Sequence, residues 1–260
     1  MPSLEFAGAT DVGRKRDHNE DALLVLPEHS LAVVCDGMGG HEAGEVASGI
    51  GVETVKRFFE LTNDPEATWP FRYDRTKDEG SNLLSVAAQW ANQRIREAGG
   101  DNGNAAKGKR GMGTTFVGCL LRGSKAWFGW VGDSRGYVWR RGELHPTTSD
   151  HSLLNEMIRT GRLSGEDIEN FQHKNVITRA LGMAEQTEVD VNTWDLEPGD
   201  VCLVCCDGLT GMVPDQRIAE ILGREPDLEA ACKRLVEEAN EAGGVDNITV
   251  ALVRYDPTRQ

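Results

Sequence analysis

The sequence lacks any long hydrophobic run. None of its apolar stretches approaches the roughly 20 residues that a membrane-spanning helix needs. Residues 1–6 contain neither a basic start nor an apolar signal segment. These absences argue against a membrane anchor and a secretory signal, so we expect no membrane partner and a cytoplasmic protein.

Positive charge is scarce relative to negative charge. The chain has 28 Lys and Arg against 42 Asp and Glu, which gives a formal net charge of −14. Such a surface repels nucleic acid and anionic lipid, so neither is an expected partner. An acidic surface often serves solubility alone, but we expect part of this charge to be clustered carboxylate that binds metal.

Cysteine occurs without the pattern of a zinc site. Cys202 and Cys205 have the Cys-x-x-Cys spacing of a zinc-binding pair, but no second pair and no His partner accompanies them. Five of the six cysteines lie in apolar runs, and Cys232 lies in a helical pattern. All six are therefore predicted to be reduced residues of the core.

The chain is long enough for one large domain. It has 260 residues, of which 39% are hydrophobic, and a strand-rich domain can reach this length. The sequence shows no internal repeat and no low-complexity tract. The glycine- and charge-rich stretch 99–113 is interpreted as a surface connection within a single domain, 1–260, rather than as a linker.

The hydrophobic pattern predicts the order of strands and helices. The expected strands are residues 4–10, 22–27, 31–36, 114–121, 125–131, 136–140, 188–194, 201–206 and 248–254. The expected helices are residues 42–61, 82–98, 150–161, 214–222 and 227–242. Strands and helices are grouped rather than regularly alternating, which favours an α+β fold with antiparallel sheets.

Four aspartates stand at the ends of strand-like runs that are far apart in the sequence. They are Asp36, Asp133, Asp207 and Asp246. A carboxylate at the end of a buried strand is unfavourable unless something binds it. Oxygen ligands without His or Cys companions suit Mg²⁺ or Mn²⁺. The pattern therefore predicts a divalent-metal site that the four carboxylates share.

A glycine-rich turn follows the first of these aspartates, in the segment Asp36-Gly37-Met38-Gly39-Gly40. A phosphate-binding loop is one alternative. However, the segment lacks the Lys-Ser/Thr of a P-loop and the spacing of a dinucleotide fingerprint. A metal ligand on a tight turn fits better, because glycine lets a backbone carbonyl approach the same cation.

A charged segment, residues 14–21, precedes the strands that lead to Asp36. Taken alone, it is typical of a solvated turn. Its neighbourhood favours function, because the guanidinium of Arg16 can bind a phosphate dianion through two hydrogen bonds. A nearby carboxylate, such as that of Glu20, can hold water on a metal ion.

Segments that contain these residues match a known family in order and span nearly the whole chain. They are Arg16-x-x-Asn19-Glu20-Asp21, Asp36-Gly37-Met38-Gly39-Gly40-His41, Gly113-Thr114-Thr115, Gly132-Asp133-Ser134-Arg135, Asp150-His151-Ser152, Thr178-Arg179-Ala180-Leu181-Gly182, Cys206-Asp207-Gly208-Leu209 and Asp246-Asn247-Ile248-Thr249. Each is weak alone, but together they are specific. The chain resembles the metal-dependent protein phosphatases of the protein phosphatase 2C (PPM) type, particularly the compact bacterial members.

The resemblance implies a centre of two or three Mn²⁺ or Mg²⁺ ions. Asp36 would bridge two of the ions, and the Gly37 carbonyl would complete the coordination of one. Asp207 and Asp246 would ligate the other. Glu20 would act through metal-bound water.

The resemblance also implies a substrate site and a fold. Arg16 would hold the substrate phosphate, and Asp133 with Asp207 resembles the pair that binds a third, weaker metal in bacterial members. Segment 150–181 corresponds to the family's flap, which would influence the choice of phosphoprotein. The implied fold is a four-layer α/β/β/α sandwich of two antiparallel sheets flanked by helices, with the metals at one edge.

The sequence departs from the family in two places. Members from higher organisms often carry a His, proposed as a general acid, directly after the Asp-Gly pair, where this chain has Met38. His41 is then a candidate acid, and a structural His at a helix start is the alternative. The connector 62–81 is longer than in the shortest bacterial versions. Its Trp69 and Phe71 are expected to pack on the adjacent helices, and a docking role is the alternative.

The resemblance implies a monomeric phosphatase that hydrolyses phosphoserine and phosphothreonine in proteins by direct attack of a dimetal-bound water. Its partners would be phosphorylated substrates of Ser/Thr kinases. No cysteine lies in a Cys-x5-Arg loop and Asp36 is not in an Asp-x-Asp motif, which disfavours a covalent phosphoenzyme. Two alternatives are a metallo-phosphohydrolase of small phosphoesters and a catalytically weak binding module of the same fold. Retention of Arg16 and all four aspartates argues against the binding module.

Overall fold

The computed structural model describes residues 3–39, 42–62, 68–100, 111–163, 165–169, 171, 173 and 176–257. One sheet contains the strands β1 (Ser3–Asp11), β7 (Arg135–Arg140), β8 (Glu143–Pro146), β10 (Val201–Cys205) and β11 (Ile248–Asp256). The order across this five-stranded sheet is β1-β11-β10-β7-β8, and every pairing is antiparallel. The N-terminal and C-terminal strands of the described chain are therefore neighbours.

The second sheet contains the strands β2 (Asp21–Leu26), β3 (Leu31–Met38), β4 (Gly113–Thr114), β5 (Phe116–Arg122), β6 (Lys125–Val131) and β9 (Asp190–Asp195). The order is β2-β3-β5-β6-β9, and the short β4 pairs with the end of β3. A single 3₁₀ turn, Pro27–His29, joins β2 to β3. The antiparallel register of these two strands places Asp21 directly opposite Asp36.

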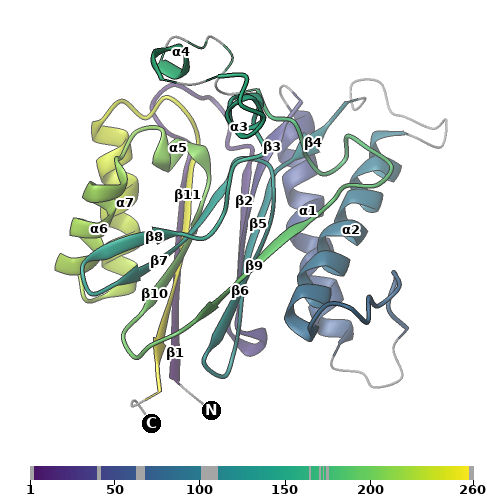
Figure 1. Cartoon of the computed structure of the whole chain (residues 1–260), viewed down its shortest axis with the longest axis horizontal. Coiled ribbons are helices and arrows are strands. Elements are labelled where there is room, and N and C mark those ends of the chain that lie inside the picture. Colours follow the sequence, from purple (N-terminus) through teal and green to yellow (C-terminus); the bar gives the residue numbers. More distant parts are fainter. Residues whose placement is uncertain are drawn as a thin grey trace.

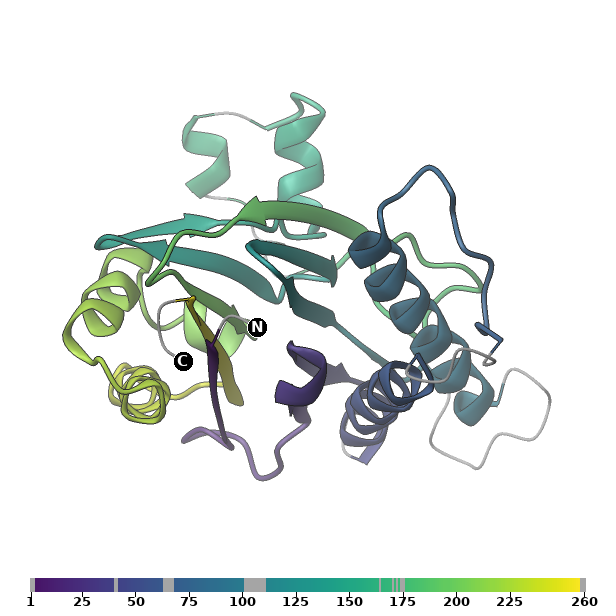
Figure 2. The same ribbon diagram turned by 90° about the horizontal axis from the view of Figure 1, so that it is seen from below.

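Helices cover the outer faces of both sheets. The described residues form the helices α1 (Glu42–Leu61), α2 (Glu79–Gly99), α3 (Leu153–Arg159), α4 (Glu166–Glu169), α5 (Asp207–Thr210), α6 (Asp215–Arg224) and α7 (Leu228–Glu241). Figure 1 shows α6 and α7 beside the five-stranded sheet, and α1 and α2 beside the other. Seen from below in Figure 2, α3 and α4 project away from these layers. The predicted α+β sandwich of two antiparallel sheets flanked by helices is confirmed.

Both faces of the central strands are buried. In β3, the side chains of Val33 and Cys35 pack toward α1 and α2, whereas Ala32 and Val34 pack between the two sheets. The side chains of β10 alternate in the same way, with one set packed toward α6 and α7 and the other packed between the two sheets. Successive side chains of a strand point to opposite faces, so a strand in the middle of four layers needs a continuous apolar run. This explains why these two strands could be predicted from the sequence.

The aromatic residues of the connector before α2 pack as expected. Trp69 and Phe71 are partly buried against the core beneath α1 and α2. The ring of Trp69 lies edge-on to that of Phe58, with 5.3 Å between their centroids. The prediction that these aromatics pack on the adjacent helices is therefore confirmed, although residues 63–67 of the connector lie outside the described part.

The strand β8 and two short helices, α4 and α5, were not predicted from the sequence. The segment Glu143–Pro146 is short, polar and ends in proline, so it carries no strand signal. It becomes a strand because Arg141 and Gly142 adopt positive φ angles of 52° and 93°, which form a tight hairpin with β7. The helix expected over 150–161 begins only at Leu153, because Ser152 pairs with Ile177 and caps the helix.

The cysteines are as predicted. All six are buried and none is in a disulfide. Within the described ranges, none of the helices combines the length and the hydrophobicity of a membrane-spanning segment.

Candidate metal centre

The four predicted aspartates converge from separate elements. Asp36 lies near the end of β3, Asp133 lies in the turn between β6 and β7, Asp207 begins α5, and Asp246 precedes β11. These ends of β3, β10 and β11 lie at the same end of the sandwich in Figure 1. Burial raises the pKa of Asp36 well above its usual range, and the charges of Asp207, Asp133 and Asp246 add to that shift.

The backbone of Asp36 is fixed on both sides. Its N–H donates to Thr115 Oγ1 at 2.9 Å, and its carbonyl accepts from Thr115 N at 2.8 Å and from Thr114 Oγ1 at 2.8 Å. Thr115 Oγ1 in turn lies 2.7 Å from Ser134 Oγ. The carboxyl group of Asp36 is therefore held in the site despite its unfavourable burial.

Glycine lets α1 approach the end of β3. A Cβ on Gly37 would collide with the carbonyl oxygen of Gly44 in α1, and a Cβ on Gly44 would lie 2.8 Å from the carboxyl carbon of Glu20. Gly37 N also donates to Glu20 O at 3.1 Å. These close approaches bring the backbone of Gly37 and the side chain of Glu20 together beside Asp36.

Asp246 and Asn247 hold the loop that carries Arg16. Asn247 Oδ1 accepts from Glu20 N at 2.8 Å, and its Nδ2 donates to the carbonyls of Val12 and His18 at 2.9 Å each. Arg16 donates to Asp246 Oδ2 at 2.7 Å. The guanidinium expected to bind phosphate is therefore next to a predicted metal ligand, while the Arg16 side chain stays 47% exposed to solvent.

Asp133 is a buried acid with an unsatisfied oxygen. Its side chain is 9% exposed, and among the described residues Oδ1 has no hydrogen-bond partner. Burial raises its pKa to about 7, and the charges of Asp207 and Asp150 contribute. Burial also raises the pKa of Asp207, followed by repulsion from Asp246. A divalent cation would relieve all of these penalties, since cations favour the ionised carboxylate.

The donor set is all oxygen, which fits Mg²⁺ or Mn²⁺. In the part of the chain that the structure describes, no three His, Cys, Asp or Glu side chains cluster closely enough to form a metal cage on their own. Backbone carbonyls, such as that of Gly37, and water would have to complete the coordination. Mg²⁺ commonly keeps several of its waters in this way.

Asp21 also belongs to the cluster, although it received no metal role from the sequence. It faces Asp36 across the strand pair, and its Oδ2 accepts from Thr249 Oγ1 at 2.6 Å. Burial raises its pKa to about 6, and repulsion from Asp207 and Asp246 contributes. The motif Asn19-Glu20-Asp21 was a signal for it, but its place in the cluster depends on the strand register.

His151 is a second residue that the sequence did not place. It is buried, its ring stacks on Trp130 with 6.0 Å between centroids, and Gly132 N donates to its Nδ1 at 3.1 Å. Its neighbour Asp150 pairs with Arg135 through contacts of 2.9 and 2.7 Å. Desolvation lowers the pKa of His151, which favours the neutral ring. The motif Asp150-His151-Ser152 marked these residues without indicating their partners.

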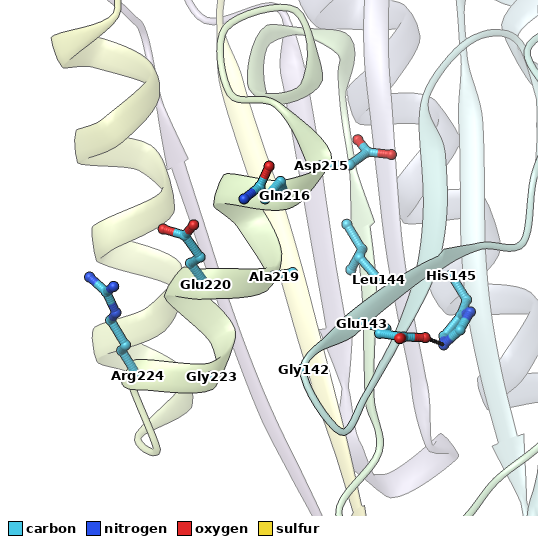
Figure 3. Close-up of a pocket in the computed structure, with 10 residues that line it drawn as sticks. All are labelled: Gly142, Glu143, Leu144, His145, Asp215, Gln216, Ala219, Glu220, Gly223 and Arg224. Atoms are coloured by element: carbon cyan, nitrogen blue, oxygen red, sulfur yellow. Dashed lines mark ion pairs between the residues drawn. The ribbon is translucent and has the colours of Figure 1, made fainter.

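Figure 3 shows a groove elsewhere on the molecule, between α6 and the β7–β8 hairpin. Its lining includes Leu144 and Ala219, and Glu143, Glu220 and Arg224 are charged groups along it. No residue predicted for the site lines this groove. His41, the candidate acid, and Gly40 lie outside the described residues.

A family model described as "Protein phosphatase 2C" matches residues 8–248. The "Serine/threonine phosphatase stp" of Listeria monocytogenes is 36% identical over 258 residues, which cover 96% of each chain. The structure of the Streptococcus agalactiae serine/threonine phosphatase covers 98% of this chain and 100% of its own, with a TM-score of 0.82 and 36% identity. The catalytic domain of the phosphatase PstP, solved with two manganese ions, covers 97% of this chain and 98% of its own, with a TM-score of 0.79 and 31% identity.

Proposed function

Because the chain belongs to the protein phosphatase 2C family, we propose that it is a metal-dependent phosphatase of phosphoserine and phosphothreonine in proteins. The observation that carries the proposal is the convergence of carboxylates from β3, α5 and the turn before β11, where the charges of Asp207 and Asp246 act on the buried carboxyl group of Asp36. Relatives named as serine/threonine phosphatases match nearly the full length of the chain. We further propose that residues 1–260 act as one monomeric domain with the flap at 150–181.

The metal ions would be held by oxygen atoms of this chain. Asp36, Asp207, Asp246 and the Gly37 carbonyl would hold two Mn²⁺ or Mg²⁺ ions, and Glu20 would act through water. Such ions would supply a nucleophile by lowering the pKa of water and would neutralise charge on the phosphoryl group. The raised pKa of Asp36 supports this assignment, because a bound cation would favour the ionised carboxylate and so oppose the burial and the repulsion that cause the shift.

Asp133 would contribute to a further, weaker metal site together with Asp207. Its unsatisfied Oδ1 and its raised pKa support a ligand role. A buried carboxyl oxygen without a partner is unfavourable in a finished fold unless a ligand completes it. Without a ligand, Oδ1 of Asp133 would lower the stability of the folded protein and serve no function.

Arg16 would bind the phosphate of the substrate. Asn247 fixes the ends of the loop that carries it, so the guanidinium has a defined place next to Asp246. A phosphate dianion would compete with the Asp246 carboxylate for this guanidinium, since both accept two-pronged hydrogen bonds from Arg. In that exchange, Arg16 would orient the phosphoryl group for in-line attack.

Protonation of the leaving alcohol needs a source other than the residue after Gly37. Met38 occupies that position and has no proton to give. We propose that water held in the site, or His41, supplies the proton. Replacing His41 with Ala distinguishes the two, because only a His41 acid would lower kcat selectively for substrates with a poor leaving group.

The test compares a phosphothreonine peptide with free phosphoserine at saturating Mn²⁺. A protein phosphatase should favour the peptide in kcat/KM by at least about tenfold, which is about 1.4 kcal/mol in the transition state. Asp36→Asn, which keeps the side-chain size, and excess chelator should each abolish the peptide activity. Faster hydrolysis of the small ester would favour the metallo-phosphohydrolase alternative, and no hydrolysis of either would favour the binding module.

A further inference from the structure

His151 joins the flap to the turn that carries Asp133. It stands at the root of the flap segment 150–181, where its backbone carbonyl accepts from Thr178 N at 2.8 Å. Its backbone N–H donates to Gly132 O at 2.9 Å, and its side chain accepts from Gly132 N at 3.1 Å. Both backbone polar groups of Gly132 are therefore bonded to this single residue.

The side-chain contacts of His151 define one tautomer. Nδ1 accepts a hydrogen bond from Gly132 N, so in the neutral ring the proton is on Nε2. Nε2 lies 3.0 Å from Asp190 Oδ2, which is positioned to accept a hydrogen bond from the Nε2–H group. Arg179 lies 3.3 Å from the other oxygen of Asp190 and 3.5 Å from Nε2. Asp190 thus orients the ring, and Arg179 holds Asp190.

Gly132 has little freedom to move once it is bonded in this way. It has a φ of 108°, and a Cβ there would lie 2.7 Å from the Cγ2 of Thr115. Thr115 is the residue whose hydroxyl accepts from Asp36 N. The hydrogen bond from Gly132 to His151 therefore fixes the backbone directly before Asp133 against the residue that holds Asp36.

We propose that His151 is a positioning residue for Asp133, acting through the Nδ1 acceptor that holds the N–H of Gly132, and with it the Val131–Gly132 peptide, in the turn directly before Asp133. Groups that orient a metal ligand typically change metal affinity by about 10–100-fold when they are lost. The inference rests on the proposed function in one respect, namely that Asp133 binds the weaker metal ion.

Two substitutions of similar size separate the acceptor role from general packing. His151→Asn places an amide oxygen near the position of Nδ1, so it can still accept from Gly132. His151→Gln places its amide near the position of Nε2, so it can reach Asp190 but leaves Gly132 N–H without an acceptor. Both variants lose the stacking on Trp130, so the packing loss cancels when they are compared.

The measurement is Mn²⁺ binding by titration calorimetry, with circular dichroism as a check on the fold. His151→Gln should weaken the weaker Mn²⁺ site by about tenfold or more, whereas His151→Asn should stay within about threefold of the wild type. The tighter sites should change little in either variant. Equal weakening by the two variants would overturn the proposal, because it would assign the effect to packing.

Two further measurements test the role of Asp133 and the tautomer of His151 separately. Asp133→Asn is the reference: if it leaves all Mn²⁺ binding unchanged, the ligand assignment of the proposed function is wrong, independently of His151. Nitrogen NMR of the wild-type protein should find His151 neutral with its proton on Nε2. A proton on Nδ1 would refute the positioning role even if neither variant folds, because Nδ1 could not then accept from Gly132.

Discussion

Removing the carboxylate of Asp133 should stabilise the metal-free protein. The pKa of this group rises from an ordinary value of 3.8 to about 7, first because of burial and then because of Asp207 and Asp150. In excess chelator, the ionised form therefore lowers stability at neutral pH. The full difference between the two pKa values corresponds to at most about 4 kcal/mol.

Because the pKa of Asp133 is higher in the folded state than in the unfolded state, its contribution to stability depends on pH. Between the unfolded pKa near 4 and the folded pKa near 7, the native state keeps the proton that the unfolded state has lost. The stability that this proton confers is complete below the unfolded pKa and is lost as the pH rises through the folded pKa. About 2 kcal/mol of it should disappear between about pH 5.5 and about pH 8.5.

The assay is thermal unfolding of wild type and Asp133→Asn in excess chelator at those two pH values. The advantage of the variant should grow by about 2 kcal/mol from the lower to the higher pH, or roughly 4–8 °C in Tm for a chain of this size. Comparing two pH values removes the pH-independent cost of burying an amide. A constant difference between the two proteins would refute the electrostatic reasoning.

Asp150→Asn is the matched control. The carboxylate of Asp150 is also largely buried, but Arg135 neutralises it through two short contacts. Its removal leaves the guanidinium without a counter-charge, so stability should fall by about 1–3 kcal/mol at both pH values. The two substitutions thus have the same chemistry and opposite expected signs.

Three other predictions concern activity. Asp207→Ala and Asp246→Ala should each lower phosphatase turnover by orders of magnitude at saturating Mn²⁺ while circular dichroism stays native; more than about a tenth of wild-type turnover would contradict the ligand assignment. Arg16→Ala should bind Mn²⁺ nearly normally by calorimetry but show a raised KM or lower kcat on phosphopeptides, and Arg16→Lys should restore only part of the loss; wild-type kinetics in both would mean that Arg16 is only a surface ion-pair partner. Asn247→Ala should lower both stability, by about 1–3 kcal/mol, and kcat/KM, because it releases the Arg16 loop; unchanged kinetics would exclude this positioning role.

The sequence was most informative where burial follows a simple pattern. The strands β3 and β10 read as continuous apolar runs because both of their faces are packed. The long helices α1, α2 and α7 repeat apolar residues along one face. β8 escaped prediction because the adjacent turn and its partner β7, not its own residues, make it a strand.

The site could be predicted only in part, for a related reason. Asp36, Asp207 and Asp246 stand at the ends of recognisable strands, so their type and position both indicate ligands. Asp21 required the β2–β3 register, since a shift of one residue would turn its side chain to the other face. His151 required tertiary contacts with Gly132 and Asp190 that no local spacing encodes.

Packing and electrostatics oppose each other at this end of the sandwich. Repulsion between Asp36 and its neighbours would normally be relieved by a shift of the strands, but Val34 and Cys35 of β3 are fully buried in two different cores. The hydrogen bonds between Thr115 and the backbone of Asp36 also restrain β3 within the plane of the sheet. Arg16 and Arg135 offset part of the repulsion, and a bound proton or cation would relieve the rest. The cores on both faces of β3 thus convert an unfavourable arrangement of carboxylates into affinity for a divalent ion.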